Sequence, residues 1–386
     1  MNIAYFSKTR LPSKAANSVQ SMEMCAAFVE LSHSVTFFVI SESDEENRPD
    51  KQVIFAAYDL APTFDLEFIN IPRSRGSRVL YIWSVVWAVF RIRRALKKRS
   101  FDLVYSRDVL AALIGASLGT PSVFEAHFPA WFGRLEAVFF RFLLQHKKFK
   151  GLVCITDALK SAYLSRYGPR LKGAVVVAPD AARKPREDQS PATLRGSPDA
   201  LKIGYVGHLY RGKGMEIIAA LGEEMSGSEF HVIGGTSHDL NFWKKRAPSN
   251  VFFYGFVDRS RIGGYFKAID VCLLPNQLHV ETSGAMQAER VSNIASFTSP
   301  LKMFEYMAYA KAIVASDLPV LREILTNTTE AILVPLDDIG AWRAAIEFFS
   351  DPDRREKFGQ RARNAFLKNY TWQHRAQKIL MAIEQS

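Results

Sequence analysis

The sequence has few cysteines and lacks any apolar run long enough to cross a membrane. Its three cysteines, Cys25, Cys154 and Cys272, are far apart, and each lies inside an apolar stretch. A small, odd and dispersed set forms neither a disulfide framework nor a zinc site, which favours a reducing compartment. The opening segment MNIAYFSKTR has too short an apolar stretch for a secretory signal. We therefore expect a cytoplasmic protein.

Acidic residues are under-represented. Fifty Lys and Arg face 39 Asp and Glu, which gives a net charge of +11. Such a charge suits nucleic acid, an anionic membrane surface or an acidic substrate, so its distribution along the chain matters more than its size. Two segments that read as helices hold much of it, at 78–99 and 131–150.

The first of these segments combines cations with large apolar side chains. Two helical stripes are expected: one carries cations and the other apolar residues, namely Arg91, Arg94 and Lys98, and Leu80, Trp83, Trp87 and Phe90. Aromatic residues beside cations suit a lipid headgroup interface, which favours a peripheral protein at the inner face of the cell membrane. The alternative is a pair of core helices with solvated basic ends.

The chain of 386 residues is long enough for two globular domains. Apolar runs that read as strands alternate with helical segments in both halves, which predicts two doubly wound α/β domains with parallel sheets. We place the first domain at 1–182, a polar linker at 183–200 and the second domain at 201–369. Ligands of such sheets bind at the carboxyl ends of the strands, so a cleft between the domains is the expected site.

A glycine-rich loop, GHLYRGKG at 207–214, follows the first strand of the second domain and opens a helix. Its amides and cations suit a diphosphate, although a glycine-rich turn with solvated charges is the plainer alternative. The position after Lys213 is Gly214, which has no hydroxyl to hold Mg²⁺. A P-loop NTPase is therefore disfavoured.

The segment SPLKMFEYMAYAKAIVASDLPVLREIL at 299–325 reads as a loop, a helix, a buried strand and a second helix start. Pro300 fits the first helical turn and Ser299 can cap it, so the helix start attracts anions. Lys302 adds a cation, and Glu305 is an acceptor suited to the paired hydroxyls of a ribose. The segment therefore favours a nucleotide-linked sugar.

This segment resembles the donor site of retaining GT-B glycosyltransferases, the group that includes glycogen-synthase-like enzymes. The resemblance implies a GT-B fold, with two Rossmann-like domains facing a cleft and a C-terminal helix at 370–386 that crosses back to the first domain. One position departs from the family: Phe297 stands where a first glutamate is usual. Backbone amides of Thr298 to Leu301, Lys302 or Glu281 are the candidates to replace it.

The resemblance also assigns roles to other residues. Lys213 matches a lysine that neutralises the leaving diphosphate, and His208 stands where an arginine is usual, so Arg211 is a candidate substitute. His127 follows a strand of the first domain and matches a histidine that contacts the donor sugar. Asn17 is a candidate acceptor contact, or else a helix cap together with Ser18. The turn Gly255, Phe256 and Val257 resembles the place where the backbone reads the base.

Together these features predict a retaining glycosyltransferase that transfers a sugar from a nucleoside-diphosphate sugar to a glycan or lipid-linked acceptor in polysaccharide or glycolipid assembly. No cofactor is expected, Mg²⁺ is not expected to be essential, and nucleic acid is not an expected partner. Two alternatives stay open: a nucleotide-sugar 2-epimerase of the same fold, and a basic scaffold or nucleic-acid-binding protein.

Overall fold

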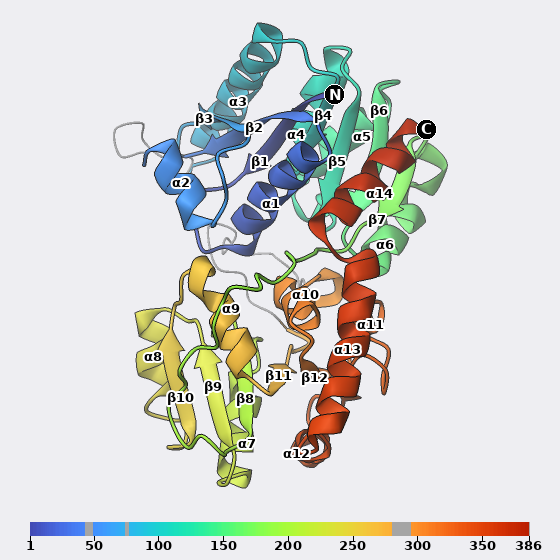
Figure 1. Cartoon of the computed structure of the whole chain (residues 1–386). Coiled ribbons are helices and arrows are strands. Elements are labelled where there is room, and N and C mark those ends of the chain that lie inside the picture. The colour runs from blue at the N-terminus through green and yellow to red at the C-terminus, as the bar shows by residue number, and fades with distance from the viewer. Residues whose placement is uncertain (43–48, 74–76, 280–294, 386) are drawn as a thin grey trace. The chain divides into compact units, whose positions relative to one another are not determined.

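The computed structural model describes residues 1–42, 49–73, 77–279 and 295–385. The chain divides into two compact units (Figure 1). Unit 1 comprises Met1–Pro179 and Trp372–Ser386, and unit 2 comprises Asp180–Thr371. The predicted domain ends at 182 and 369 lie within three residues of these divisions.

Among its described residues, unit 1 contains a parallel sheet of seven strands in the order β3-β2-β1-β4-β5-β6-β7. These strands are β1 (Asn2–Lys8), β2 (Ser34–Ser41), β3 (Asp65–Asn70), β4 (Leu103–Ser106), β5 (Ser122–Ala126), β6 (Phe149–Cys154) and β7 (Ala174–Val177). The central strands are apolar because helices cover both faces of the sheet. The strand order reverses at β1, so the carboxyl ends of β1 and β4 mark the topological switch point.

The helices of unit 1 lie on both faces of this sheet (Figure 1). They are α1 (Ala16–Glu30), α2 (Lys51–Ala57), α3 (Arg78–Lys98), α4 (Val109–Ser117), α5 (Arg134–Leu143), α6 (Asp157–Tyr167) and α14 (Trp372–Glu384), with the short 3₁₀ helices η2 (Ala130–Phe132) and η3 (Gly168–Arg170). The C-terminal helix α14 belongs to unit 1 and packs against α1, as expected.

Unit 2 holds, within the residues the structure describes, a six-stranded parallel sheet in the order β10-β9-β8-β11-β12-β13. Its strands are β8 (Lys202–Val206), β9 (Glu229–Ile233), β10 (Val251–Gly255), β11 (Val271–Leu274), β12 (Ala312–Ser316) and β13 (Ile332–Val334). Its helices are α7 (Met215–Glu224), α8 (Ser237–Trp243), α9 (Arg259–Ala268), α10 (Leu301–Ala308), α11 (Pro319–Arg322), α12 (Ile339–Phe348) and α13 (Pro352–Asn369), with the 3₁₀ turn η5 (Ala295–Phe297). The switch point here lies between β8 and β11.

The segment at 183–200 is not a free linker, because it packs within unit 2. The Ala192 amide donates to the Gly264 carbonyl at 2.8 Å, and the Arg195 amide donates to the Tyr254 hydroxyl at 2.8 Å. A Cβ at Gly264 would lie 2.9 Å from the carbonyl oxygen of Ser190. Because Gly264 has no side chain, the polar segment at 183–200 can lie against α9.

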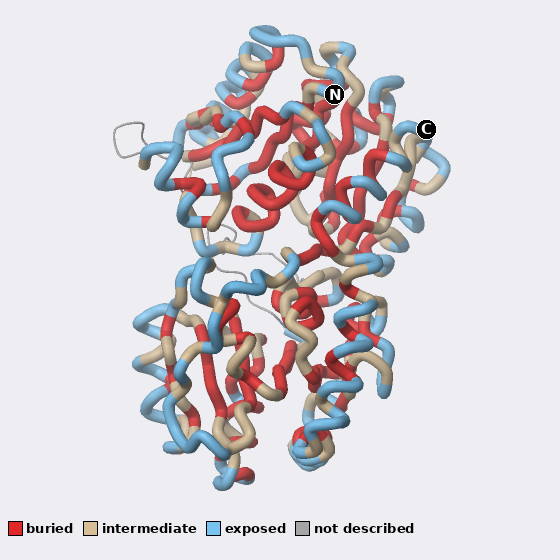
Figure 2. The backbone as a smooth tube through the Cα atoms, in the orientation of Figure 1, coloured by how far each residue is buried: buried red, intermediate tan, exposed pale blue. Residues whose placement is uncertain are grey.

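Cores of aliphatic and aromatic residues fill both units (Figure 2). In unit 1, Phe6 and Phe38 stack with ring centres 4.7 Å apart under α3 and α4. The three cysteines are buried and free, as predicted. Among the described residues, no helix is both long enough and apolar enough to cross a membrane.

Candidate active site

The loop at 207–214 lies at the switch point of unit 2 and is held tightly to the loop that follows β11. The Gln277 amide donates to the Gly212 carbonyl at 3.1 Å. Gly214, the N-cap of α7, has φ +81°, and a Cβ there would lie 2.0 Å from the Pro275 carbonyl oxygen. Only glycine satisfies both the left-handed backbone and this close approach. The loop is therefore a fixed backbone cradle at the carboxyl end of β8.

Lys213 lies in this loop next to the N-cap of α7 and is partly buried. Burial lowers the pKa of its ammonium group to about 8. The Nζ atom lies 5.2 Å from the ring centre of Tyr210, which offers cation–π attraction but no opposite charge.

A second lysine of lowered pKa, Lys302, lies in the first turn of α10. It is buried, its Nζ atom lies 3.9 Å from the ring centre of Tyr205, and that atom has no hydrogen-bond partner among the described residues. Burial lowers the pKa of Lys302 well below its usual value, and the charge of Lys213 lowers it further. The positive charge of each lysine disfavours the charge of the other, and Nζ of Lys302 has no hydrogen-bond partner among the described residues. An anion bound beside them would stabilise both charges.

The start of α10 differs from its prediction. The N-cap is Pro300, and no side chain caps the helix within the described part of the chain. Ser299 instead accepts a hydrogen bond at its Oγ atom from the Asp180 amide, at 3.0 Å. The prediction that Ser299 caps this helix is wrong, because its hydroxyl holds the first residue of unit 2. The amide groups of the first turn, beginning with Leu301, remain uncapped by side chains.

Glu305 lies one turn after Lys302, and its negative charge raises the pKa of Lys302. Arg259 of α9 approaches Glu305, with its Nη2 atom 3.4 Å from the Oε1 atom of the carboxylate. Both side chains are partly exposed, so Glu305 keeps room to accept other hydrogen bonds. Phe297 ends η5, and Glu281 lies outside the described residues.

The other predicted residues of unit 2 are less closely joined to this cluster. The His208 ring stacks on Tyr210 at 5.4 Å between ring centres, and its carbonyl accepts from the Tyr205 hydroxyl at 2.6 Å. Arg211 is exposed. Gly255 ends the edge strand β10 with φ +71°, followed by the exposed Phe256 and the partly buried Val257.

In unit 1, His127 follows β5 and is held by a buried carboxylate. Its Nε2 atom lies 2.6 Å from Oε1 of Glu125. Burial, together with the nearby Arg107 charge, lowers the pKa of His127 to about 4, so the ring is neutral at pH 7. Because Glu125 is an acceptor, Nε2 carries the proton and Nδ1 keeps its lone pair. His127 is thereby set up to accept a hydrogen bond from a hydroxyl group.

Glu125 is the centre of a buried network. Its side chain is 0% exposed, and it accepts from the side chains of Gln20, Tyr105, His127 and Arg375. Arg375 of α14 makes a two-pronged contact, with both its Nη atoms 3.1 Å from the two carboxylate oxygens. Burial alone would raise the pKa of Glu125, but Arg375, with His127, holds it well below its usual value. The C-terminal helix thus supplies the counter-charge for the residue that holds His127.

Asn17 does not cap α1, whose N-cap is Ala15. The helix begins earlier than expected, so Asn17 lies within its first turn and its Oδ1 atom accepts from the Ser18 amide at 2.9 Å. Arg107, which follows β4, donates to the Asn17 carbonyl at 2.9 Å and to the Gln20 side chain. The cap prediction for Asn17 and Ser18 is wrong; a contact between Asn17 and an acceptor stays a prediction.

Three arginines of these clusters were missed: Arg107, Arg259 and Arg375. Arg107 could have been found, because it stands directly after a buried strand at the carboxyl edge of the sheet. Arg375 also left a signal, since it falls on the apolar stripe of its helix between Trp372 and Ile379. Arg259 left none, because its partner Glu305 is 46 residues away.

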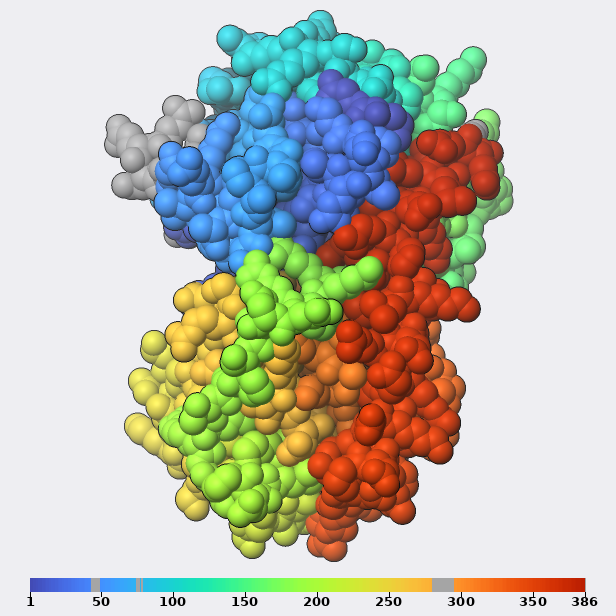
Figure 3. Space-filling model, viewed as in Figure 1, coloured from blue at the N-terminus to red at the C-terminus, as the bar shows by residue number. Residues whose placement is uncertain are grey.

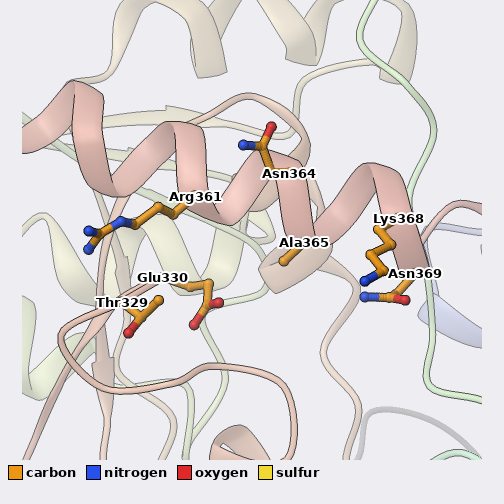
Figure 4. A pocket seen from close by; sticks show the side chains of 7 residues that line it. All are labelled: Thr329, Glu330, Arg361, Asn364, Ala365, Lys368 and Asn369. Carbon is orange, nitrogen blue, oxygen red and sulfur yellow. The ribbon is translucent and has the colours of Figure 1, made fainter.

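A separate polar hollow lies on unit 2 (Figure 4). Its lining comes from the loop before β13 and from α13: Thr329, Glu330, Arg361, Asn364, Ala365, Lys368 and Asn369. It contains none of the predicted site residues, so we do not assign it to the active site.

Two family models match the chain. The Glycosyltransferase Family 4 model matches residues 18–180, and the Glycosyl transferase-like model matches residues 213–381. A curated relative, the uncharacterized 41.2 kDa protein in the cps region of Klebsiella pneumoniae, is 24% identical over 142 residues. This match covers 36% of the chain and about a third (34%) of that relative's length.

Solved structures agree in fold. The sucrose-phosphate synthase of Thermosynechococcus elongatus has a TM-score of 0.71 at 17% identity, covering 100% of this chain and 98% of that one. HepE of Anabaena in complex with UDP-glucose has a TM-score of 0.67 at 13% identity, covering 100% of both chains. With glycosyltransferase models matching both halves and two Rossmann-like units, the chain belongs to the GT-B glycosyltransferases.

Proposed function

We propose that the protein is a retaining glycosyltransferase that uses a nucleoside-diphosphate sugar as its donor. The proposal rests on the pair Lys213 and Lys302, one partly buried and one buried lysine, both of lowered pKa and close to the start of α10, which no side chain caps. A diphosphate supplies the negative charge that this arrangement lacks. The complex of HepE with UDP-glucose supports the choice of donor.

The two lysines have a chemical task in this reaction. The bond between the anomeric carbon and the diphosphate oxygen breaks with its electron pair on oxygen, so negative charge grows on the leaving group. Preorganised cations in a poorly hydrated site stabilise that charge and lower the barrier.

We propose that Mg²⁺ is not essential, since the lysines and the α10 amides take this role. Excess EDTA should then leave the rate unchanged.

Retention follows from attack on the same face from which the diphosphate leaves. The acceptor oxygen bonds to the anomeric carbon as the oxocarbenium-like sugar forms, and the leaving phosphate oxygen takes the acceptor proton. A buried carboxylate nucleophile is not needed. We propose that Nδ1 of the neutral His127 accepts a hydrogen bond from a sugar hydroxyl, and that Glu305 accepts from the ribose hydroxyls. Proton NMR of the first-formed product tests the anomeric configuration.

The proposed acceptor is a glycan or a lipid-linked saccharide in cell-surface polysaccharide or glycolipid assembly, met at the cytoplasmic side of the membrane. The basic and aromatic helices of unit 1 support this choice. A nucleotide-sugar 2-epimerase would instead give product without any acceptor. Incubation with donor alone, followed by analysis of the sugar, separates the two activities.

Thermal unfolding tests donor binding directly. A ligand that binds only the folded state stabilises it by about 2.7 kcal/mol at a hundred times its dissociation constant. We expect UDP, ADP or GDP, and the matching sugar nucleotide, to raise the melting temperature of the wild-type protein. The rise should persist in Lys245→Ala, which removes an exposed lysine of unit 2, and shrink in Lys213→Ala. No shift with any nucleotide at millimolar concentration would contradict the proposal.

Replacing Glu305 by Ala should weaken donor binding by roughly 10- to 100-fold, since a hydrogen bond to a charged group contributes about 1.5–3 kcal/mol. The expected signature is a raised donor KM. A 2′,3′-dideoxy nucleotide provides the control. Wild-type protein should bind it more weakly than the parent nucleotide, whereas Glu305→Ala should bind both alike. Retained discrimination would show that another group contacts the ribose.

A further inference from the structure

Helix α3 exposes a set of large apolar side chains to solvent instead of burying them in the core of unit 1. Five of them are more than half exposed, from 53% for Val86 to 63% for Val79, the others being Ile82, Trp83 and Phe90. Leu80 and Trp87 flank them at 46% and 40%. Single exposed apolar residues are ordinary on a protein surface, but a contiguous set on one helix marks an interaction site. Figure 3 shows the atoms of this part of the chain, in cyan, at the surface of unit 1.

The helix already buries a different face in its own unit. Ser84, Ala88, Ile92 and Leu96 recur every four residues and are all buried against the sheet and α4. A residue every four positions stays on one side of a helix, so the exposed apolar residues lie on the opposite side. In Figure 2, α3 is correspondingly red on its inner side and pale blue outside. The alternative of a core helix is therefore wrong for the exposed apolar residues of α3.

The outward face changes character along its length. Its first three turns are apolar, and its last two turns carry five exposed cations, Arg91, Arg93, Arg94, Lys97 and Lys98. The sequence from 78 to 98 contains no Asp or Glu to offset them. The Arg91 guanidinium lies over the Trp87 ring at 5.5 Å from its centre, so cation and aromatic surface meet in the middle of the helix.

The apolar first turns and basic last turns of α3 together indicate which kind of partner binds this surface. A nucleic acid would pair with the cations and leave the apolar turns in water. In a twofold dimer, the two helices would bring cations against cations, or cations against the partner's apolar turns, both unfavourable. A bilayer of anionic lipids offers phosphates and acyl chains at the same interface, and basic, aromatic helix faces bind there.

We propose that α3 docks unit 1 on an anionic lipid bilayer. Trp83, Val86 and Phe90 enter the headgroup region together with Val79 and Ile82, while the basic last turns lie against the lipid phosphates. The apolar run is too short to span the hydrocarbon core, so the helix lies in the interface. The docking does not depend on the identity of the donor.

Vesicle sedimentation of the full chain tests this. We expect binding to phosphatidylcholine vesicles that contain about 30% of the anionic lipid phosphatidylglycerol, and much weaker binding to pure phosphatidylcholine. The variant Arg93→Gln, Arg94→Gln, Lys97→Gln should lose about a hundredfold in partition, and so should Trp83→Ser, Val86→Ser, Phe90→Ser. The loss caused by the charge variant should shrink at high salt, because salt screens the cations, whereas the loss caused by the apolar variant should not.

Matched controls come from unit 2. Phe242→Ser removes an exposed aromatic residue of α8, and Arg361→Gln, Arg363→Gln, Lys368→Gln removes three exposed cations of α13. Both should bind vesicles like the wild type, and thermal unfolding should show that every variant is folded. Equal binding of all variants, absent binding of the wild type to anionic vesicles, or a doubled mass in light scattering that the apolar variant abolishes would each overturn the proposal.

Discussion

Transfer by the Lys213→Ala variant is expected to be about 10²- to 10³-fold slower than transfer by the wild type, the usual cost of removing one preorganised group that stabilises developing charge. The effect should fall mainly on kcat, because the charge on the diphosphate grows as the glycosidic bond breaks. Radiolabelled sugar transfer under single-turnover conditions measures it. Lys245→Ala is the matched control. A fully active Lys213→Ala enzyme would remove the leaving-group role of this residue.

The same lysine should give nucleotide binding a characteristic pH dependence. In the free protein, burial lowers the pKa of Lys213 to about 8. A bound diphosphate favours the protonated form, so binding takes up a proton above pH 8 and affinity falls as pH rises beyond that value. Titration calorimetry in buffers of different ionisation enthalpy measures the uptake. Lys213→Arg should make the fall shallower, because a guanidinium stays protonated; an unchanged profile would assign the titration to another group.

Most of the fold could be predicted because its strands are continuous apolar runs bounded by turn residues, as in VTFFVI and AIVAS. Two edge strands were missed for physical reasons. β3 mixes charged and apolar residues in DLEFIN, because only Leu66 and Ile69 are buried in it, and β13 has only three residues. The segment at 183–200 was taken for a linker because its polar composition resembles one, whereas its backbone hydrogen bonds fix it to unit 2.

The site was predictable where its chemistry is local in sequence. Lys213 and Gly214 stand in a recognisable loop, and Lys302 and Glu305 share one helix turn. What could not be predicted is how burial changes them. Lys302 was expected only to add a cation near the start of its helix, yet it is buried, and its pKa is lowered first by burial and then by the charge of Lys213, which lies 89 positions earlier. The pairing of Glu125 with Arg375 joins residues 250 positions apart, beyond the reach of any sequence pattern.

Arg375→Met should destabilise unit 1 by about 3–5 kcal/mol, the typical cost of removing one partner of a buried ion pair. Glu125 is fully buried, and its remaining hydrogen-bond partners, Gln20, Tyr105 and His127, are neutral, so of the cations that lower its pKa Arg107 would remain. Urea unfolding measures the change. Lys378→Met, at an exposed cation of the same helix, should leave the stability of unit 1 nearly unchanged.

The pH dependence of stability distinguishes an unpaired buried charge at Glu125 from a simple loss of packing. In the wild type, the pKa of Glu125 is held below its unfolded value, so its contribution is present above about pH 4.5 and is lost as pH falls through the folded-state pKa. Arg375 is the strongest of the interactions that hold this pKa down, so we expect its loss to let burial shift the pKa of Glu125 upward. The gap in stability between wild type and Arg375→Met should therefore narrow as the pH is lowered towards 4. A constant gap would point to packing alone.

Removing the unpaired buried charge of Glu125 separates stability from activity. Adding Glu125→Gln to Arg375→Met replaces a buried carboxylate by a neutral amide of the same shape, and we expect most of the lost stability to return. Activity should not return with it. A Gln at position 125 can accept from His127 through its carbonyl oxygen or donate to it through its amide, so the ring loses its fixed protonation pattern and Nδ1 is no longer reserved for a substrate hydroxyl. A stable but impaired double variant would show that Arg375 and Glu125 hold His127 in place; full activity would reduce the network to a structural ion pair.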